Sequence, residues 1–411
     1  MTPTFFAWCL FLQSVTPEVI EHAQAGTAAA QKGQLDVAIR EFRRVTELQP
    51  NSAVGHAHLG DAYFQHGEYA AAIPELELAL QLNPNLMDTH QTLGVLLLMQ
   101  GSPEEALPHL EKMRTPALLG LAYLETGRFS GAITALQIAL DQQPNDPDLL
   151  YYFGRATALA SKRSFDQLVK VNPDLARKRS AAADNEGGPP RDVVSLQNAL
   201  TEQPNDANLL FAFSRAAAQA SKQAFDQVLQ SNANSARAHQ VLAERYFESG
   251  RFAEAQREYA ESLRLKPYTA NVHLALGDVF AAEGKWSAAV AQFRMETQLR
   301  PASAEAFYSL GSGLLQQGQT SAAVEQLAQA DRLRPNTPKI LLALGRAEFA
   351  AQDSARAEAA WTKLLGIDNK SGLAASAHLG LSTLYRRAGK SQEADREKAA
   401  YEQLKNQGGP N

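Results

Sequence analysis

The chain has 411 residues, of which 45% are hydrophobic and 20% charged, and its formal net charge is −5. This balance can form a large core, which excludes global disorder, and it supplies no overall basic field for nucleic acid. A single cysteine, Cys9, excludes an intramolecular disulfide and any CxxC site. No apolar run approaches the roughly 20 residues that span a bilayer. We therefore expect a folded protein with no transmembrane span and no nucleic-acid partner.

The first residues form an apolar segment. Residues 5–12 read Phe-Phe-Ala-Trp-Cys-Leu-Phe-Leu, which matches the apolar core of about 7–15 residues in a signal peptide. A basic start and well-placed small residues for cleavage are missing, and Trp8 before Cys9 disfavours a lipoprotein site. Two interpretations stay open. Residues 1–14 act as an export signal for a periplasmic or other extracytoplasmic protein, or residues 1–18 pack over the first repeat of a cytoplasmic one.

From Val19 onward, a pattern recurs every 34 residues, as the spacing of Pro267, Pro301 and Pro335 shows. Counted from Val19, each unit tends to carry a small residue at position 8, glycine at 15, alanine at 20, a large apolar residue at 24 and proline at 32. The glycines at position 15 are Gly33, Gly67, Gly101, Gly127, Gly250, Gly284, Gly318 and Gly389.

Each recurring residue type has a physical reason. Apolar residues at helical spacing on both sides of position 15 predict two amphipathic helices per unit. Glycine at 15 permits the left-handed conformation that ends the first helix. Small residues at 8 and 20 let the two helices approach closely, and the large residue at 24 fills the space beside them. Proline at 32 ends the second helix. Each unit is therefore predicted to be a helical hairpin.

The register divides the chain into about twelve units. Eight have 34 residues, and the four shorter ones all lie between Met87 and Ser235. We expect an N-terminal array at 19–146, atypical shortened and duplicated repeats at 147–235, and a C-terminal array at 236–408. The polar run Glu393–Lys398 in the last unit is typical of the solvent-facing end of a repeat array, so we expect the array to end there.

The middle contains a duplication. Residues 143–177 and 203–237 are identical at 19 of 35 positions, and both copies lack five residues around the hairpin turn, including the glycine of position 15. We therefore predict that 148–170 and 208–230 each form one continuous helix or a tightened hairpin. Residues 184–190, Asp-Asn-Glu-Gly-Gly-Pro-Pro, are expected to be the most protease-sensitive stretch. The irregularity indicates a bend or joint, or drift in a duplicated array.

The register resembles the tetratricopeptide repeat family, whose pattern also places an aromatic residue at position 11. Here that position holds Tyr63, Tyr123, Tyr246, Phe280 and Tyr385. The resemblance covers the chain from Val19 to about Gly408. It implies an all-α solenoid of about twelve helix-turn-helix repeats forming a right-handed superhelix, here with an irregular middle section. The implied function is that of a non-catalytic protein–protein interaction scaffold.

In this family, positions 2, 5, 6, 9, 12 and 13 face the concave side. Carried onto the middle units, they predict an apolar and aromatic groove with a few arginines, suited to a peptide or partner protein. The alternative is that these side chains pack internally because the units are irregular. The groove residues are Val95, Leu98, Met99, Leu118, Leu121, Leu124, Tyr151, Tyr152, Arg155, Phe211 and Arg215.

One family subtype clamps the C-terminal carboxylate of chaperones with Lys and Asn at positions 5 and 9. Those positions hold Ala57 and Asp61 in one unit and Leu274 and Asp278 in another, and no consecutive units supply the set. The sequence does not support that function.

We expect no catalytic, cofactor-binding or metal-binding residues. Six histidines occupy position 4 of separate units, which predicts packing residues too far apart to share an ion: His22, His56, His90, His239, His273 and His378. Gly389-Lys390-Ser391 imitates a phosphate loop, but Leu384 stands where the loop needs glycine. Two alternatives to the scaffold remain: an envelope-located, chaperone-like holder of unfolded or secreted clients, and a cryptic enzyme. The sequence leaves the oligomeric state open.

Overall fold

The computed structural model describes residues 16–181 and 192–407. The apolar segment at residues 1–15 and the predicted protease-sensitive stretch at 184–190 lie outside these ranges. Within them, all regular secondary structure is helical, in 22 helices, and none of these helices is long and apolar enough to cross a membrane. The prediction of an all-α helical repeat fold is confirmed.

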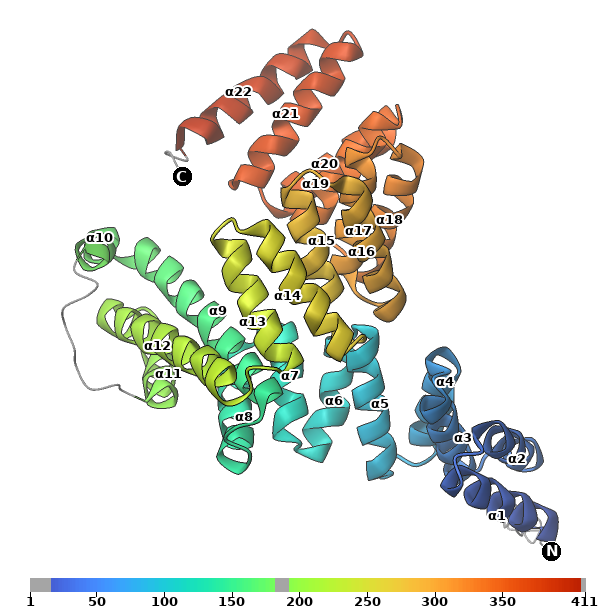
Figure 1. The fold of residues 1–411 in the computed structure, drawn as a ribbon. Helices are drawn as coiled ribbons and strands as arrows, with labels where there is room; N and C mark the ends of the chain where they lie inside the picture. The colour runs from blue at the N-terminus through green and yellow to red at the C-terminus, as the bar shows by residue number, and fades with distance from the viewer. Residues whose placement is uncertain (1–15, 182–191, 408–411) are drawn as a thin grey trace, which may run out of the picture. The chain divides into compact units, whose positions relative to one another are not determined.

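The chain forms two compact units, and Figure 1 labels the helices in chain order. Unit 1 comprises the described residues of Met1–Leu98 together with Pro103–Thr126, and unit 2 comprises Met99–Ser102 and the described residues from Gly127 onward. The helices up to the end of unit 1 are α1 (Pro17–Gln31), α2 (Leu35–Leu48), α3 (Ala53–His66), α4 (Tyr69–Leu82), α5 (Met87–Gln100), α6 (Pro103–Met113) and α7 (Pro116–Glu125).

From Gly127 onward, unit 2 consists of α8, a middle section and five regular hairpins. The helices of the first part are α8 (Phe129–Gln142), α9 (Pro147–Val171), α10 (Pro173–Ala181), α11 (Val193–Glu202) and α12 (Ala207–Ser231). The hairpin helices are α13 (Ala236–Glu248), α14 (Phe252–Leu265), α15 (Val272–Ala282), α16 (Trp286–Leu299), α17 (Ala304–Gln316), α18 (Thr320–Leu333), α19 (Pro338–Ala350), α20 (Ser354–Ile367), α21 (Gly372–Arg387) and α22 (Ser391–Gln407).

The glycines of position 15 adopt the predicted left-handed conformation. All eight have positive φ, between 69° and 88°, a region that costs residues with a Cβ about 1–2 kcal/mol. In the unit that begins at Pro338, Gln352 replaces this glycine and adopts φ 65°. The hairpin turn therefore imposes the conformation even where the residue disfavours it.

Close approach of the two helices is confirmed in six hairpins that carry glycine at position 8. A Cβ added to Gly277 would lie 2.4 Å from a ring carbon of Phe293, and one added to Gly345 would lie 2.4 Å from Nε1 of Trp361. The position-20 alanines beside them are at most 1% exposed. Positions 8, 20 and 24 thus form the contact between the two helices of a hairpin.

The position-4 histidines make a polar contact that the sequence analysis did not predict. The Nδ1 atom of each histidine lies within hydrogen-bond distance of a side-chain atom of the residue at position 23, on the second helix of the same hairpin. His56 Nδ1, for example, is 2.6 Å from Glu75 Oε2, and His378 Nδ1 is 2.6 Å from Glu397 Oε2. The partners of the others are Glu41, His109, Glu258 and Gln292. These histidines hydrogen-bond across the hairpin rather than only packing.

The two duplicated segments each form one continuous helix, α9 and α12, of 25 residues apiece. The continuous-helix form of the prediction is confirmed. Asp146 Oδ1 accepts from the Leu149 backbone N–H, and Asp206 Oδ1 accepts from Leu209 N–H, both at 2.8 Å, so the copies begin with the same cap. Figure 1 shows α9 and α12 packed beside each other.

Candidate functional site

In helices α9 and α12, the first half of each helix packs against the second half of the other helix, and we call this arrangement the exchange of halves. In a regular hairpin, the glycine at position 8 contacts position 24 of its own unit. Gly154 of α9 instead faces α12, because a Cβ there would lie 2.7 Å from Cε1 of Phe225. Phe225 is the counterpart of Phe165 in the second copy, 60 residues later. Phe165 packs in turn against a cluster that contains Leu210 and Phe211 of α12. We call α9 and α12 the exchanged pair.

The loss of the turn explains the exchange. Without the five residues around position 15, neither copy can reverse direction, so its second half has no access to its first half. Each apolar half must then be buried against the other copy, as happens when a short hinge drives a domain swap.

Hydrogen bonds hold the exchanged pair together. Gln167 Nε2 donates to Pro204 O at 2.9 Å, and its counterpart Gln227 donates to Pro144 O at 3.0 Å. Between the two contacts, Ser161 Oγ donates to Ser214 O at 2.8 Å and Ser214 Oγ donates to Ser161 O at 3.0 Å. The glutamine contact is therefore the same in the two copies, whereas the serine contact joins positions that are not counterparts, because the counterparts of Ser161 and Ser214 are Ser221 and Gly154.

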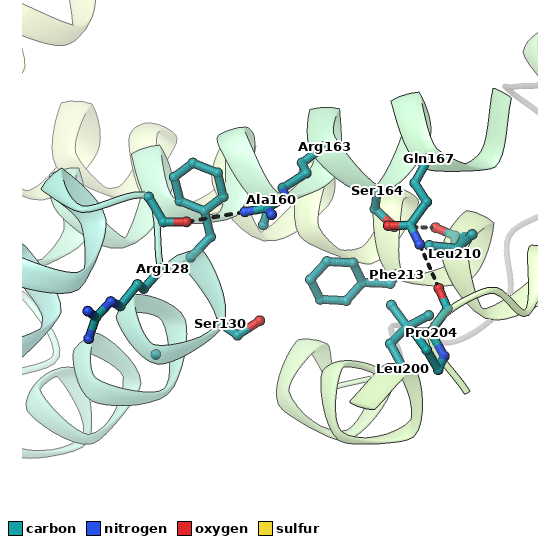
Figure 2. A pocket seen from close by; sticks show the side chains of 13 residues that line it. Arg128, Ser130, Ala160, Arg163, Ser164, Gln167, Leu200, Pro204, Leu210 and Phe213 are labelled. Carbon is teal, nitrogen blue, oxygen red and sulfur yellow. Dashed lines mark hydrogen bonds between the residues drawn. The ribbon is translucent and has the colours of Figure 1, made fainter. Parts of the chain in front are cut away.

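A cleft of about 310 Å³ opens between the start of α8 and the exchanged pair. Its apolar lining comes from Phe129, Ala160, Leu200, Leu210 and Phe213. Figure 2 shows polar side chains of α9 along one side of the cleft and the start of α8 on the other. The remaining lining residues are Gly127, Arg128, Ser130, Gly131, Arg163, Ser164, Gln167 and Pro204. We call this feature the middle cleft.

Hydrogen bonds fix the walls of the middle cleft (Figure 2). Arg163 Nη1 donates to Gly127 O at 3.3 Å, and the guanidinium lies 5.9 Å from the centre of the Phe129 ring. Ser164 Oγ donates to Leu210 O at 3.1 Å. Because these bonds tie α9 to the turn before α8 and to α12, a ligand would meet a preformed surface, and binding would cost little free energy for ordering it.

A buried polar network connects α9 to α13. Arg237, which is 5% exposed, donates from Nε to Asp148 Oδ1 at 2.5 Å and from Nη2 to Tyr152 Oη at 2.5 Å. Lys266 Nζ donates to Asp148 Oδ2 at 2.9 Å. Burial opposes ionisation of Asp148, but Arg237 and Lys266 outweigh it and hold the pKa of this carboxyl below its ordinary value.

Tyr151 is the second centre of this network. Its hydroxyl donates to Glu244 Oε1 at 2.6 Å and accepts from Gln240 Nε2 at 2.5 Å and from Arg155 Nη1 at 3.3 Å. Burial and the neighbouring Glu244 carboxylate raise the pKa of the Tyr151 hydroxyl, so it stays protonated and can donate. A satisfied buried network of this kind fixes one arrangement of the two helices.

The predicted groove residues fall into both units. In unit 1, Leu98 is buried and Val95, Leu118, Leu121 and Leu124 are half-buried, with Leu98, Leu118 and Leu121 in the hydrophobic core of the unit. In unit 2, Tyr151 and Phe211 are buried, and Tyr152 and Arg155 are half-buried in or beside the polar network.

The two predicted groove residues with exposed side chains are Met99 and Arg215, and the Arg215 guanidinium lies 5.8 Å from the centre of the Phe211 ring. The structure therefore brings Tyr151, Tyr152 and Arg155 together, but in contacts within the chain. A partner-binding role for the groove stays a prediction.

Sequence reasoning missed the middle cleft. The sequence did carry a signal for the packing that forms this cleft, because the five-residue deletion in both copies implied that neither copy could fold back on itself. What the register could not indicate is that α11 would supply Leu200 and that the α8 start would supply Phe129 to the same cleft.

Several solved structures are similar in part. MamA from Desulfovibrio magneticus RS-1 is 21% identical, with a TM-score of 0.40 over 43% of this chain and 97% of that chain. PilF from Pseudomonas aeruginosa is 18% identical, with a TM-score of 0.40 over 52% of this chain and 94% of that one. The APC/C hetero-tetramer Cut9–Hcn1 is 15% identical, with a TM-score of 0.39 over 95% and 88% of the two chains.

No curated protein matches the sequence. The family model of the tetratricopeptide repeat matches residues 24–86, 118–167, 241–304, 274–339 and 308–372, which together make up more than half of the chain. The chain belongs to the tetratricopeptide repeat family.

Proposed function

We propose that this protein is a non-catalytic scaffold for protein–protein interaction, and that a partner protein inserts an apolar side chain into the middle cleft. The observation that carries the proposal is the apolar lining of that cleft, formed by the half-buried Phe129 and Leu200 and the buried Phe213. Polar residues, among them Arg163 and Gln167, line the cleft as well. Membership of a repeat family whose surfaces bind proteins supports the same function.

The polar part of the lining suits a peptide backbone. Arg163 is exposed, and the hydrogen bond from its guanidinium to Gly127 O leaves further donors for a partner's carbonyl or carboxylate groups. An apolar anchor surrounded by such donors is the usual arrangement at the centre of a protein interface.

Catalysis has less support than binding. Within residues 16–181 and 192–407, no group of three or more His, Cys, Asp or Glu side chains could hold a metal ion. The buried titratable groups around Tyr151 are fully engaged with one another between α9 and α13. They therefore connect helices and do not face the middle cleft.

A crosslinking pull-down with the full chain tests the proposal. Ser130→Trp fills the mouth of the middle cleft from an exposed position on α8, and Asn198→Trp is the matched control, exposed on α11 but outside the lining. We expect a stoichiometric partner that is captured by the wild type and by Asn198→Trp and lost from Ser130→Trp. Equal capture by both variants would refute a role for the cleft. A mixed pool of unfolded clients would favour the chaperone-like holder instead.

We also propose that the protein is exported from the cytoplasm. This proposal rests only on the apolar residues 5–12. Fusing residues 1–18 to a reporter enzyme that is active only outside the cytoplasm should give activity. A fusion that stays inactive and intracellular would favour the cytoplasmic alternative.

A further inference from the structure

A second cleft lies between α19 and α21, where the repeat register is interrupted. Three residues, 372–374, separate the unit that begins at Pro338 from the one that begins at Ala375. Helix α21 consequently starts early and has 16 residues, against 13 in α19. We call this feature the C-terminal cleft, and it has a volume of about 230 Å³.

Trp361 of α20 forms the floor of the C-terminal cleft. A Cβ on Gly345 of α19 would lie 2.4 Å from its Nε1 atom, and one on Gly380 of α21 would lie 2.8 Å from its Cζ2 atom. The indole is 2% exposed and donates from Nε1 to Leu342 O at 3.3 Å. The floor is therefore rigid and apolar, because two glycines let one tryptophan fit beneath both helices.

The walls combine apolar side chains with cations. Phe349 and Arg346 line the α19 side, and Leu379, which is 45% exposed, lines the α21 side with Ser376 and Thr383. The Arg387 guanidinium lies 4.4 Å from the centre of the Phe349 ring, at the edge of the cleft. Arg346 is exposed and makes no hydrogen bond or ion pair with any residue in the described ranges.

The charge on these two helices opposes that of the whole chain. Helix α21 contains Arg386 and Arg387 and no acidic residue, and the one carboxylate of α19, Glu348, is 6% exposed. None of the residues that line the C-terminal cleft is acidic, although the chain carries a net charge of −5. On α19 and α21, the exposed charges beside the cleft are thus cations.

Two carboxylates of neighbouring helices that contact α21 are half-buried and hydrogen-bonded, Glu358 to Tyr385 Oη at 2.7 Å and Glu397 to His378 Nδ1 at 2.6 Å. The exposed cations therefore favour an anionic partner.

We propose that the C-terminal cleft binds an acidic peptide segment of a partner protein, with one large apolar side chain seated on Trp361 and neighbouring carboxylates paired with Arg346 and Arg387. Arginine is suited to this role because its planar guanidinium pairs with a carboxylate through two parallel hydrogen bonds. An acidic peptide is favoured over nucleic acid as the ligand. The cations lie beside a single apolar pocket, whereas nucleic acid would require a continuous row of basic residues. The inference rests on the proposed scaffold function but uses a separate surface.

The probe is a short fluorescein-labelled peptide with a central phenylalanine flanked by aspartate and glutamate, titrated with the full chain and followed by fluorescence anisotropy. Arg346→Glu and Thr383→Trp should each weaken binding by at least about tenfold. Their matched controls are Arg396→Glu on α22 and Thr362→Trp on α20, which are exposed and outside the cleft, and which should bind as the wild type does. Replacing the peptide's phenylalanine with glycine, or its acids with lysine, should abolish binding.

Four results would overturn this inference: no binding to the wild type, equal losses in the controls, equal binding of the lysine peptide, or displacement of the acidic peptide by a single-stranded oligonucleotide at equal concentration. Displacement by the oligonucleotide would indicate a surface that binds anions in general. Ser130→Trp should retain peptide binding in the same titration. A negative titration with a successful pull-down therefore refutes the C-terminal cleft alone, whereas a failed pull-down with peptide binding intact refutes only the middle cleft.

Discussion

Replacing Gly154 with alanine tests the exchange of halves between α9 and α12. In a free helix, this change would stabilise by about 1 kcal/mol, because glycine loses more backbone entropy on folding. Here the new methyl group would lie 2.7 Å from Cε1 of Phe225, so the ring must move. Overpacking of this kind costs about 1–3 kcal/mol. We therefore expect Gly154→Ala to be neutral or destabilising by up to about 2 kcal/mol.

A double-mutant cycle identifies the ring that is responsible. In a Phe225→Ala background, the clash disappears and Gly154→Ala should stabilise by about 1 kcal/mol, which gives a coupling energy of about 1–3 kcal/mol. In a Phe165→Ala background, the effect of Gly154→Ala should stay as it is in the wild type, because Phe165 packs against the cluster that includes Phe211.

The assay must report on the exchanged pair alone, since repeat arrays often unfold in stages. Native-state hydrogen exchange of peptides from α9 and α12 gives that local free energy of opening. Coupling of Gly154 to Phe165 instead of Phe225 would show that each copy folds on itself, and the exchange would then be wrong.

Two further predictions concern single positions in the C-terminal hairpins. Gln352→Gly should raise the local unfolding free energy by about 1 kcal/mol, because Gln352 adopts φ 65° where the other hairpins carry glycine; an unchanged hydrogen-exchange rate in α19 and α20 would contradict this. Glu296 is fully buried, and burial raises the pKa of its carboxyl. The hydrogen bond that Glu296 accepts from the Asn271 backbone N–H lowers the pKa but does not offset burial. Because the folded state holds this proton more tightly, stability falls as pH rises through the folded pKa, so Glu296→Gln should stabilise the protein at about pH 8 and have little effect at about pH 4. A stability difference between Glu296→Gln and the wild type that does not change with pH would refute the assignment.

Much of the hairpin architecture was predictable because it depends on local rules. Glycine at position 15 ends a helix wherever it stands, and Gly277 opposite Phe293 follows from spacing within one unit. The missing turns at α9 and α12 were equally local, so the sequence predicted a continuous helix or a tightened hairpin, and the structure shows the continuous helix in both copies. The candidate site depends on contacts between distant segments, such as Arg237 with Asp148 and Tyr152, and 34-residue spacing carries no signal for these.

The sequence by itself determined the repeat period, the regular hairpins and the loss of the turn in the two duplicated segments, because backbone conformation and amphipathic spacing are encoded within a few turns of chain. Tertiary structure alone decided that Gly154 meets Phe225 rather than Phe165 and that Tyr151 is buried rather than presented to a partner. The physical reason is that an apolar half-helix needs a partner surface but does not specify which of two near-identical copies supplies it. That choice is made by which surface the shortened chain can reach.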